Sequence, residues 1–221
     1  MIEAWLFDLD GTLVDTAPDL AAAANALRVA QGLAPLPLDH YRAHASSGAR
    51  GLIGRALGVG PDDAAFEPLR QTFLAHYAAH IADHSQVFEG LDTALRWLEA
   101  RGIPWGVVTN KPRRYTEPLM AALQLSARAT VVVSADEVPL AKPAPDALIE
   151  ACRRAGLAPQ RCAYVGDDLR DIDAGRAAGM RTVTAEWGYL GTTRPEAWQA
   201  DDRCATPAEL LDLMHPLSTQ G

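Results

Sequence analysis

The chain has 221 residues, of which 48% are hydrophobic, and this is enough for one domain of ordinary size or for a core domain with a smaller insertion. Its formal net charge of −8 argues against broad binding to nucleic acid or to an anionic membrane surface, because the mean field repels both. Three cysteines outside any CxxC pattern predict neither a disulfide framework nor a zinc site, and without an export signal or a long apolar run we expect a cytoplasmic protein with no membrane partner.

Short apolar segments, rich in β-branched and aromatic residues and bounded by Gly, Pro, Asp or Asn, predict buried parallel strands. They lie at 4–7, 103–108, 130–133, 162–165 and 181–185. Helical patterns separate them, and several of these patterns end at a glycine suited to a left-handed C-terminal position. This alternation predicts an α/β fold with a doubly wound, Rossmann-like parallel sheet.

The interval 17–87 breaks the alternation, because it holds no strand candidate. Its apolar residues recur at spacings of three and four, which is typical of helices that bury one face. We therefore expect a small α-helical insertion at 17–87, placed directly after the first strand. Residues 1–16 and 88–221 would form the α/β core.

Polar residues follow the predicted strands at the edge of the sheet where open α/β folds bind ligands. They are Asp8 and Asp10 after the first strand, Thr109 and Asn110 after the second, Lys142 in the connection after the third, and Asp167 and Asp168 after the fourth. The converging carboxylates repel one another, and Gly11 allows the sharp turn that brings the first two together. A hard cation compensates such a charge, and Mg²⁺ suits it best because it accepts carboxylates together with water and phosphate.

Four short motifs carry a family resemblance. DLDGT, the hydroxyl residue of VVTN, the lysine of AKPAPDA and the acidic residues of GDDLRD resemble, in this order, the motifs of the haloacid dehalogenase-like superfamily. The match extends over essentially the whole chain. The helical insertion resembles the small α-helical cap of that family.

The resemblance implies a Mg²⁺-dependent phosphatase that acts on a small-molecule phosphomonoester. Asp8 would be the nucleophile that forms an aspartyl-phosphate, and Asp10 would be the general acid and base. The Asp8 carboxylate, the backbone carbonyl of Asp10 and Asp167 would hold Mg²⁺. Thr109 and Lys142 would bind the phosphoryl oxygens and stabilise the charge of the transition state.

Other residues of the motifs have supporting roles in this interpretation. Asp168 and Asp171 would orient Lys142 and the metal-bound waters, although a helix-dipole role is the plainer alternative. Asn110, Lys111 and Arg50 are candidates for substrate binding. Lys111 is equally consistent with a solvated loop charge, whereas Arg50 is suited to an anionic group.

Several other functions were weighed against this one. A dehalogenase of this fold would not need an acidic residue two positions after the nucleophile, where this chain has Asp10. A dinucleotide-dependent oxidoreductase would need GxGxxG after the first strand, and that motif is absent. A sugar phosphomutase shares every core motif and remains an alternative. A non-catalytic binding module is expected to lack a motif residue, and none is missing.

The choice of substrate depends on resemblance alone. VVTNKP and the WGY after the fifth strand resemble the phosphoglycolate phosphatase-like branch. The segments SSGARGLI, HSQVFEG, WGVVTNKPRRYTEP and YVGDDLRDIDAGRAAG resemble more closely the phosphatases that act on N-acetylmuramic acid 6-phosphate in bacterial cell-wall recycling. That resemblance implies a carbohydrate substrate, with phosphoglycolate as the alternative. The oligomeric state stays open.

Overall fold

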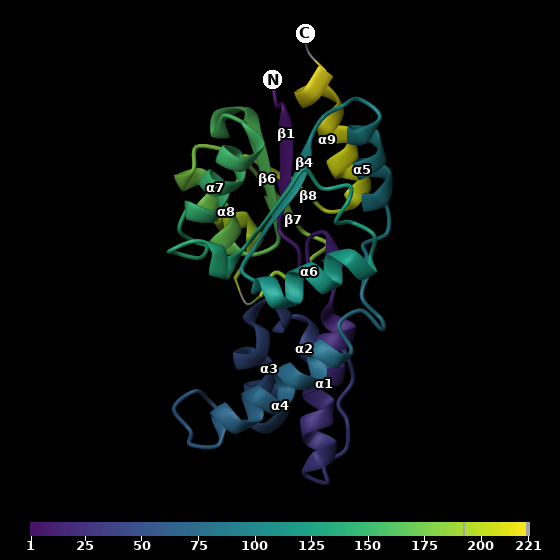
Figure 1. Cartoon of the computed structure of the whole chain (residues 1–221), viewed down its shortest axis with the longest axis vertical. Coiled ribbons are helices and arrows are strands. Elements are labelled where there is room, and N and C mark those ends of the chain that lie inside the picture. Colours follow the sequence, from purple (N-terminus) through teal and green to yellow (C-terminus); the bar gives the residue numbers. More distant parts are fainter. Residues whose placement is uncertain (192, 220–221) are drawn as a thin grey trace.

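The computed structural model describes residues 1–191 and 193–219 and has two parts (Figure 1). The larger part is a sheet with helices on both faces, and it carries both ends of the described chain. The smaller part is a group of helices that projects from one edge of the sheet. None of the described helices combines the length and the hydropathy that a membrane span requires.

The core sheet has six parallel strands in the order β5-β4-β1-β6-β7-β8. Their bounds are β1 (Ala4–Phe7), β4 (Trp105–Thr109), β5 (Val131–Ser134), β6 (Cys162–Gly166), β7 (Arg181–Ala185) and β8 (Asp202–Cys204). The doubly wound parallel sheet is thereby confirmed, with β4 and β5 beginning slightly later than predicted. β8 was not predicted, because only Cys204 of its three residues is buried and no apolar run marks it.

Side chains of the central strand alternate between the two faces of the sheet. Trp5 and Phe7 pack with helices on one face, whereas Ala4 and Leu6 pack with helices on the other. The first face is covered by α5 (Leu91–Glu99), α6 (Arg113–Ala122) and α9 (Pro207–Thr219). The second is covered by α7 (Asp146–Ala155) and α8 (Leu169–Ala177). Burial on both faces explains why these strands read as continuous apolar runs.

The projecting part is the predicted helical insertion. It comprises α1 (Ala17–Ala30), α2 (Asp39–Arg42), α3 (Gly48–Leu57) and α4 (Phe66–Ala79). Small residues on the buried face of α1, such as Ala23 and Ala24, let α3 and α4 pack closely against it. Single turns of 3₁₀ helix complete the described elements at η1 (Ala45–Ser47), η2 (Ala135–Glu137), η3 (Pro159–Arg161) and η4 (Pro195–Ala197).

One short ribbon corrects the prediction that 17–87 contains no strand. β2 (Val14–Asp15) pairs antiparallel with β3 (Gln86–Val87), so the chain enters and leaves the insertion along two adjacent segments. Two residues are too few to produce a period-two pattern, and the sequence therefore gave no signal for either strand.

Hydrogen bonds connect the segment that enters the insertion with the segment that leaves it. The carboxylate of Asp19, 1% exposed, accepts the backbone N–H groups of His84 and Ser85 and the hydroxyl of Ser85. Asp19 lies in the first turn of α1, where its charge also complements the helix dipole. The first helix of the cap is thus fixed directly to the segment that returns to the core.

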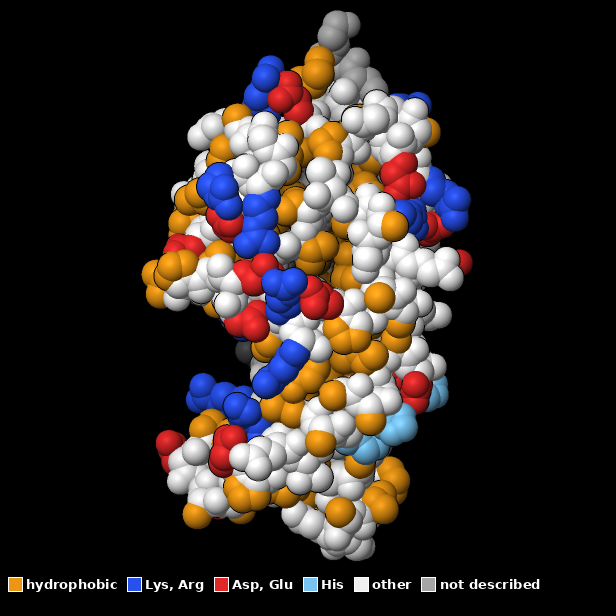
Figure 2. Space-filling view, viewed as in Figure 1, with side chains coloured by type: hydrophobic (Ala, Val, Ile, Leu, Met, Phe, Trp, Pro, Cys, Tyr) orange, Lys and Arg blue, Asp and Glu red, His pale blue; other side chains and the backbone are white. Residues whose placement is uncertain are grey.

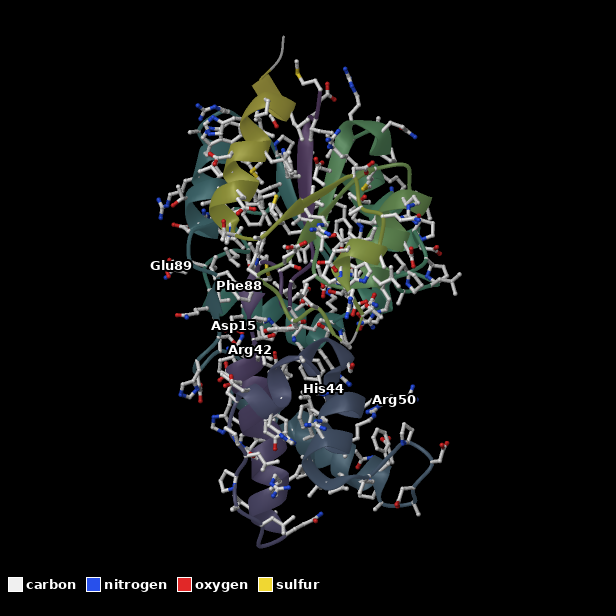
Figure 3. The ribbon with its side chains drawn as sticks, turned by 180° about the vertical axis from the view of Figure 1, so that it is seen from behind. Asp15, Arg42, His44, Arg50, Phe88 and Glu89 are labelled. Atoms are coloured by element: carbon white, nitrogen blue, oxygen red, sulfur yellow. The ribbon has the colours of Figure 1, made fainter. Side chains whose placement is uncertain are left out.

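Tyr189 of the core braces the same junction. Its hydroxyl accepts the backbone N–H groups of Thr16 and Ala17, each at 2.8 Å, and donates to Asp15 Oδ1 at 3.0 Å. Arg42 of the cap forms an ion pair with the same Asp15 carboxylate at 2.9 Å, and both residues lie at the junction in Figure 3. The start of the cap is therefore anchored by groups from both parts.

Candidate active site

A cavity of about 360 Å³ lies between the sheet edge and the cap. It is lined from the core by residues that follow β1, β4, β5 and β6, and from the cap by η1, α3 and α4. Figure 2 shows the hollow between the two parts, with Lys and Arg side chains on both its core side and its cap side. Its position is beyond the carboxyl ends of the strands, beside the point between β1 and β6 where the strand order reverses.

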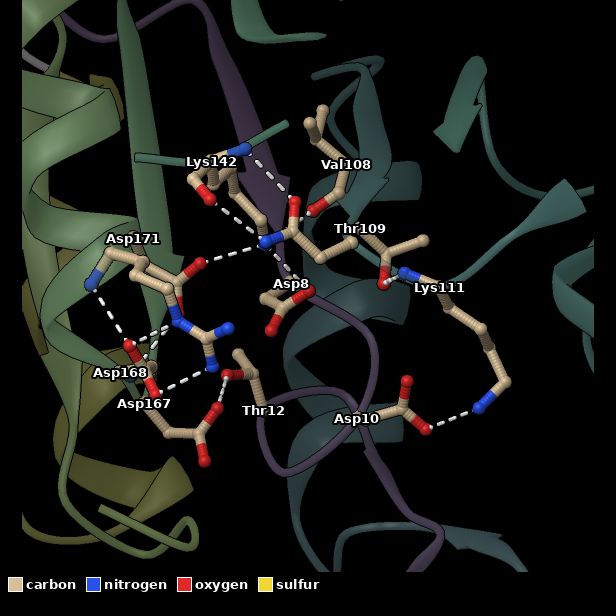
Figure 4. A network of polar contacts seen from close by, with 12 residues as sticks. Asp8, Asp10, Thr12, Val108, Thr109, Lys111, Lys142, Asp167, Asp168 and Asp171 are labelled. Carbon is tan, nitrogen blue, oxygen red and sulfur yellow. Dashed lines mark hydrogen bonds and ion pairs between the residues drawn. The ribbon is translucent and has the colours of Figure 1, made fainter. Parts of the chain in front are cut away.

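Lys142 occupies the centre of the polar network at the base of this cavity (Figure 4). Its Nζ lies 2.8 Å from Asp8 Oδ1 and 2.7 Å from Asp171 Oδ1, and it donates to the hydroxyl of Tyr164 and the carbonyl of Val108. Burial alone lowers the pKa of this ammonium, but the Asp171 and Asp8 carboxylates outweigh burial and raise the pKa above its usual value. Lys142 is therefore held as a buried cation against the end of β1.

Three carboxylates crowd around this one ammonium. Asp8, Asp167 and Asp171 each offer an oxygen within 4.8 Å of the others. Burial is the main cause that raises the pKa of Asp8 to about 7, with the Lys142 charge opposing the rise and the Asp171 charge adding to it. Burial and the neighbouring Asp8 and Asp171 raise the pKa of Asp167 well above its usual value.

This cluster fits a divalent cation. Asp167 is fully buried, yet among the described residues its oxygens accept hydrogen bonds only from the hydroxyl of Thr12 at 2.9 Å and the backbone N–H of Tyr189 at 2.8 Å. Neither neighbour neutralises its charge, and Lys142 balances only one carboxylate of the three. A cation bound by hard oxygen ligands would restore the ionised forms that burial disfavours.

Two glycines leave the space in which Asp167 sits. Gly11 has φ of +86°, and a Cβ at this position would collide with the Asp167 carboxylate. A Cβ on Gly188 would also meet Asp167. The turn expected from DLDGT is thus required both for its backbone angle and for the close approach of the acidic side chain.

Asp10 points away from that cluster (Figure 4). Its Oδ1 accepts from Thr16 Oγ1 at 2.6 Å and from Lys111 Nζ at 2.8 Å. Lys111 is largely buried, so it is not the solvated loop charge weighed as one interpretation. Burial lowers the pKa of Lys111, but Asp10 and Tyr77 outweigh this effect and raise it. Asp8 and Asp10 are therefore paired with different lysines, although only one residue separates them in the sequence.

Thr109 and Asn110 end β4 beside Lys142. The Asn110 amide donates to the carbonyl of Lys142 and accepts the N–H of Lys142, both at 2.9 Å. Thr109 Oγ1 accepts the backbone N–H of Lys111 at 3.1 Å, which leaves its own proton for another acceptor. Asn110 lines the cavity, but the contacts of its side chain hold Lys142 in place.

Asp168 and Asp171 have different partners. Asp168 caps the start of α8 and pairs with Arg170 at 2.8 Å, whereas Asp171 contacts Lys142. Arg170 also donates to the carbonyl of Ser46 in the cap at 3.0 Å. The expected contact with Lys142 is therefore made by Asp171, and Asp168 acts through Arg170 on the cap.

Arg50 lies in the first turn of α3, on the side of the cap that faces the core (Figure 3). It lines the cavity, and its side chain makes no ion pair or hydrogen bond with any described residue. Its charge is thus available to a ligand.

Sequence reasoning missed several residues of this site. Arg170 had a weak signal, an arginine at a helix start within GDDLRD. Ser46 and Tyr77 come from the cap, and no pattern distinguishes them from other residues of cap helices. Only the packing of cap on core brings them to the cavity.

The arrangement has the parts needed for phosphoryl transfer. A carboxylate next to an ammonium and a candidate cation site can attack phosphorus while the cationic groups hold the phosphoryl oxygens. The second carboxylate, Asp10, is held away from the first by its ion pair with Lys111. It can donate or accept a proton on the other side of the reacting phosphorus atom.

Comparisons with known proteins agree with this chemistry. The model of the haloacid dehalogenase-like hydrolase family matches residues 2–179. The N-acetylmuramic acid 6-phosphate phosphatase of Pseudomonas aeruginosa is 43% identical over 214 residues, covering 96% of this chain and 95% of that protein. A phosphoglycolate phosphatase of Xanthomonas campestris pv. campestris is 42% identical over 210 residues, covering 95% of each.

The fold has counterparts among solved structures. The crystal structure of a predicted phosphoglycolate phosphatase from Haemophilus somnus 129PT superimposes with a TM-score of 0.84 at 26% identity, covering 96% of this chain and 98% of that one. With the family model matched over most of the chain and phosphatases among its relatives, the chain belongs to the haloacid dehalogenase-like hydrolases and is a phosphoric monoester hydrolase.

Proposed function

We propose that this phosphatase works through an aspartyl-phosphate on Asp8, with Mg²⁺ as its cofactor and N-acetylmuramic acid 6-phosphate as its substrate. The observation that carries the mechanism is the pairing of Asp8 with Lys142 beside the buried Asp167, while Asp10 is held separately by Lys111. One carboxylate is thereby placed for attack and the other for proton transfer.

In the first step, an Asp8 oxygen forms a bond to phosphorus as the bond from phosphorus to the alcohol oxygen breaks. Asp10 gives its proton to the leaving oxygen. In the second step, Asp10 takes a proton from water, which attacks phosphorus and releases inorganic phosphate from Asp8. Each step needs Asp10 in a different protonation state, and its position away from the Asp8 cluster suits that exchange.

Positive groups stabilise the charge on the phosphoryl oxygens in both steps. Lys142 Nζ and the hydroxyl of Thr109 are suited to hold two of these oxygens. Mg²⁺, held by Asp8, Asp167 and the carbonyl of Asp10, would neutralise further negative charge. Asp171 keeps Lys142 oriented, and Asn110 fixes its backbone.

The size of the cavity and the names of two relatives support the proposed substrate. The phosphoryl-binding groups are common to all candidate esters, so selectivity depends on the groups that meet the alcohol part. The cavity of about 360 Å³ is in the range that suits small molecules larger than a two-carbon acid, and the Pseudomonas aeruginosa relative bears the name of a sugar phosphatase. Phosphoglycolate is the second candidate, supported by the Xanthomonas campestris relative.

The role of Asp8 is tested by Asp8→Asn. This change keeps the shape of the side chain but removes the attacking charge, so kcat should fall about a thousandfold or more while thermal unfolding is unchanged or shifts to higher temperature. Excess chelator should likewise abolish activity of the unchanged protein, and Mg²⁺ should restore it. Substantial turnover by folded Asp8→Asn protein would contradict the mechanism.

The products and the preferred ester separate the alternatives. We expect inorganic phosphate and the free sugar in equal amounts without a bisphosphate activator, and a higher kcat/KM for N-acetylmuramic acid 6-phosphate than for phosphoglycolate. An isomeric sugar phosphate with little free phosphate would indicate a phosphomutase. A preference for phosphoglycolate would reverse the order of the substrates but leave the hydrolytic mechanism in place.

Arg50 is expected to bind the carboxylate of the substrate. Arg50→Ala should lose about 2–4 kcal/mol of transition-state binding for the carboxylated ester and little for an aryl phosphate. Arg55→Ala is the matched control, because Arg55 is on the same helix, contacts His40 and does not line the cavity. Equal losses of kcat/KM on both esters would indicate a structural role for Arg50.

A further inference from the structure

Two hydroxyl groups on the cap wall of the cavity are buried without a hydrogen-bond partner in the described part of the chain. They are Tyr77 Oη in α4 and Ser46 Oγ in η1, and both residues line the cavity above the catalytic groups. The Tyr77 side chain is only 2% exposed. A buried hydroxyl without a partner costs free energy, and such groups in native proteins call for a specific reason.

Tyr77 packs beside Lys111, the partner of the residue that we assign to the leaving alcohol. Its ring packs 5.8 Å from that of Tyr115, and the Lys111 ammonium lies 4.7 Å from the ring centre. Lys111 attracts the Tyr77 oxygen electrostatically but lacks the geometry of a hydrogen bond to it. Lys111 in turn binds Asp10, the group that we assign to protonation of the leaving oxygen. The ring is thus fixed next to the place where the alcohol part must lie.

Ser46 is fixed from the other side. Its carbonyl accepts from Arg170, whose guanidinium pairs with Asp168 at the start of α8. This contact holds the backbone of Ser46 over the core while its hydroxyl stays unpaired. Two separate cap segments that line one cavity therefore each carry a buried hydroxyl with no hydrogen-bond partner among the described residues.

We propose that Tyr77 and Ser46 determine specificity by hydrogen bonding to the alcohol part of the substrate, which therefore carries hydroxyl, carbonyl or amide groups. This inference rests on the proposed hydrolysis and deepens it, because it names the chemical class of the alcohol. A site with unpaired polar groups rejects an ester that cannot satisfy them. The same groups add nothing to the binding of an apolar ester.

The test uses Tyr77→Phe, Ser46→Ala and the double variant in the full-length protein, with N-acetylmuramic acid 6-phosphate and phenyl phosphate as esters. Tyr77→Phe keeps the ring over Lys111 and removes only the oxygen. We expect kcat/KM on the sugar phosphate to fall about tenfold or more, and kcat/KM on phenyl phosphate to change by less than about threefold. Tm should stay the same or rise, because no hydrogen bond within the protein is lost.

Tyr41→Phe is the matched control in the same cap. Tyr41 is also buried, but its hydroxyl donates to Asn25 Oδ1 at 2.9 Å and it does not line the cavity. This variant should lower Tm and leave kcat/KM on both esters unchanged. Comparing Tm and kcat/KM of the two variants distinguishes a hydroxyl that binds the substrate from one that stabilises the fold.

Three results would overturn the inference. Equal losses on both esters would assign Tyr77 to the Lys111–Asp10 pair, no loss on either would remove both hydroxyls from substrate binding, and a lowered Tm would reveal a partner within the protein. If the unchanged enzyme prefers phosphoglycolate, the proposed substrate fails by itself. Tyr77→Phe is then compared on phosphoglycolate and phenyl phosphate, where a selective loss supports the inference and an equal one refutes it.

Discussion

The contact of one buried ammonium with two carboxylates is the interaction on which the rest of the site depends. Lys142 Nζ touches Asp8 and Asp171 at once, and Asp167 adds a third acidic group within reach. Without Lys142, the carboxylates would repel one another in a region that excludes water and would take up protons. Lys142 and a divalent cation together would keep Asp8 ionised, as its proposed role as the nucleophile requires.

The fold supplies this contact through elements far apart in sequence. The parallel strands β1 and β6 are neighbours, so Asp8 and Asp167 emerge side by side at the same edge of the sheet. The next neighbour of β1 is β4, and Asn110 at its end clamps the backbone of Lys142. The same sheet edge carries the junction with the cap, where Tyr189 joins Asp167 to the first turn of α1. The hydrogen bonds of Tyr189 therefore link the first helix of the cap to the acidic cluster.

The core could be predicted from sequence because its signals are local. Buried strands such as β1 read as apolar runs, and each ends at a polar residue that the sheet brings to a common edge. Lys111, Arg170 and Tyr77 show why the rest could not be predicted. Lys111 has the sequence context of a loop lysine, and only the packing of α4 over it explains its burial against Asp10. Besides Asp168, Arg170 contacts a backbone carbonyl of the cap, and no side-chain pattern encodes that contact.

The central claim is that the phosphoryl group passes through Asp8. Rapid acid quenching of a single turnover, followed by mass spectrometry of the peptides, measures this directly. The account predicts one transient phosphoryl group on the peptide that contains Asp8, formed before inorganic phosphate appears and absent from the Asp8→Asn protein. A phosphoryl group on another residue, or phosphate release at full rate with no phosphorylated peptide at any time, would contradict it.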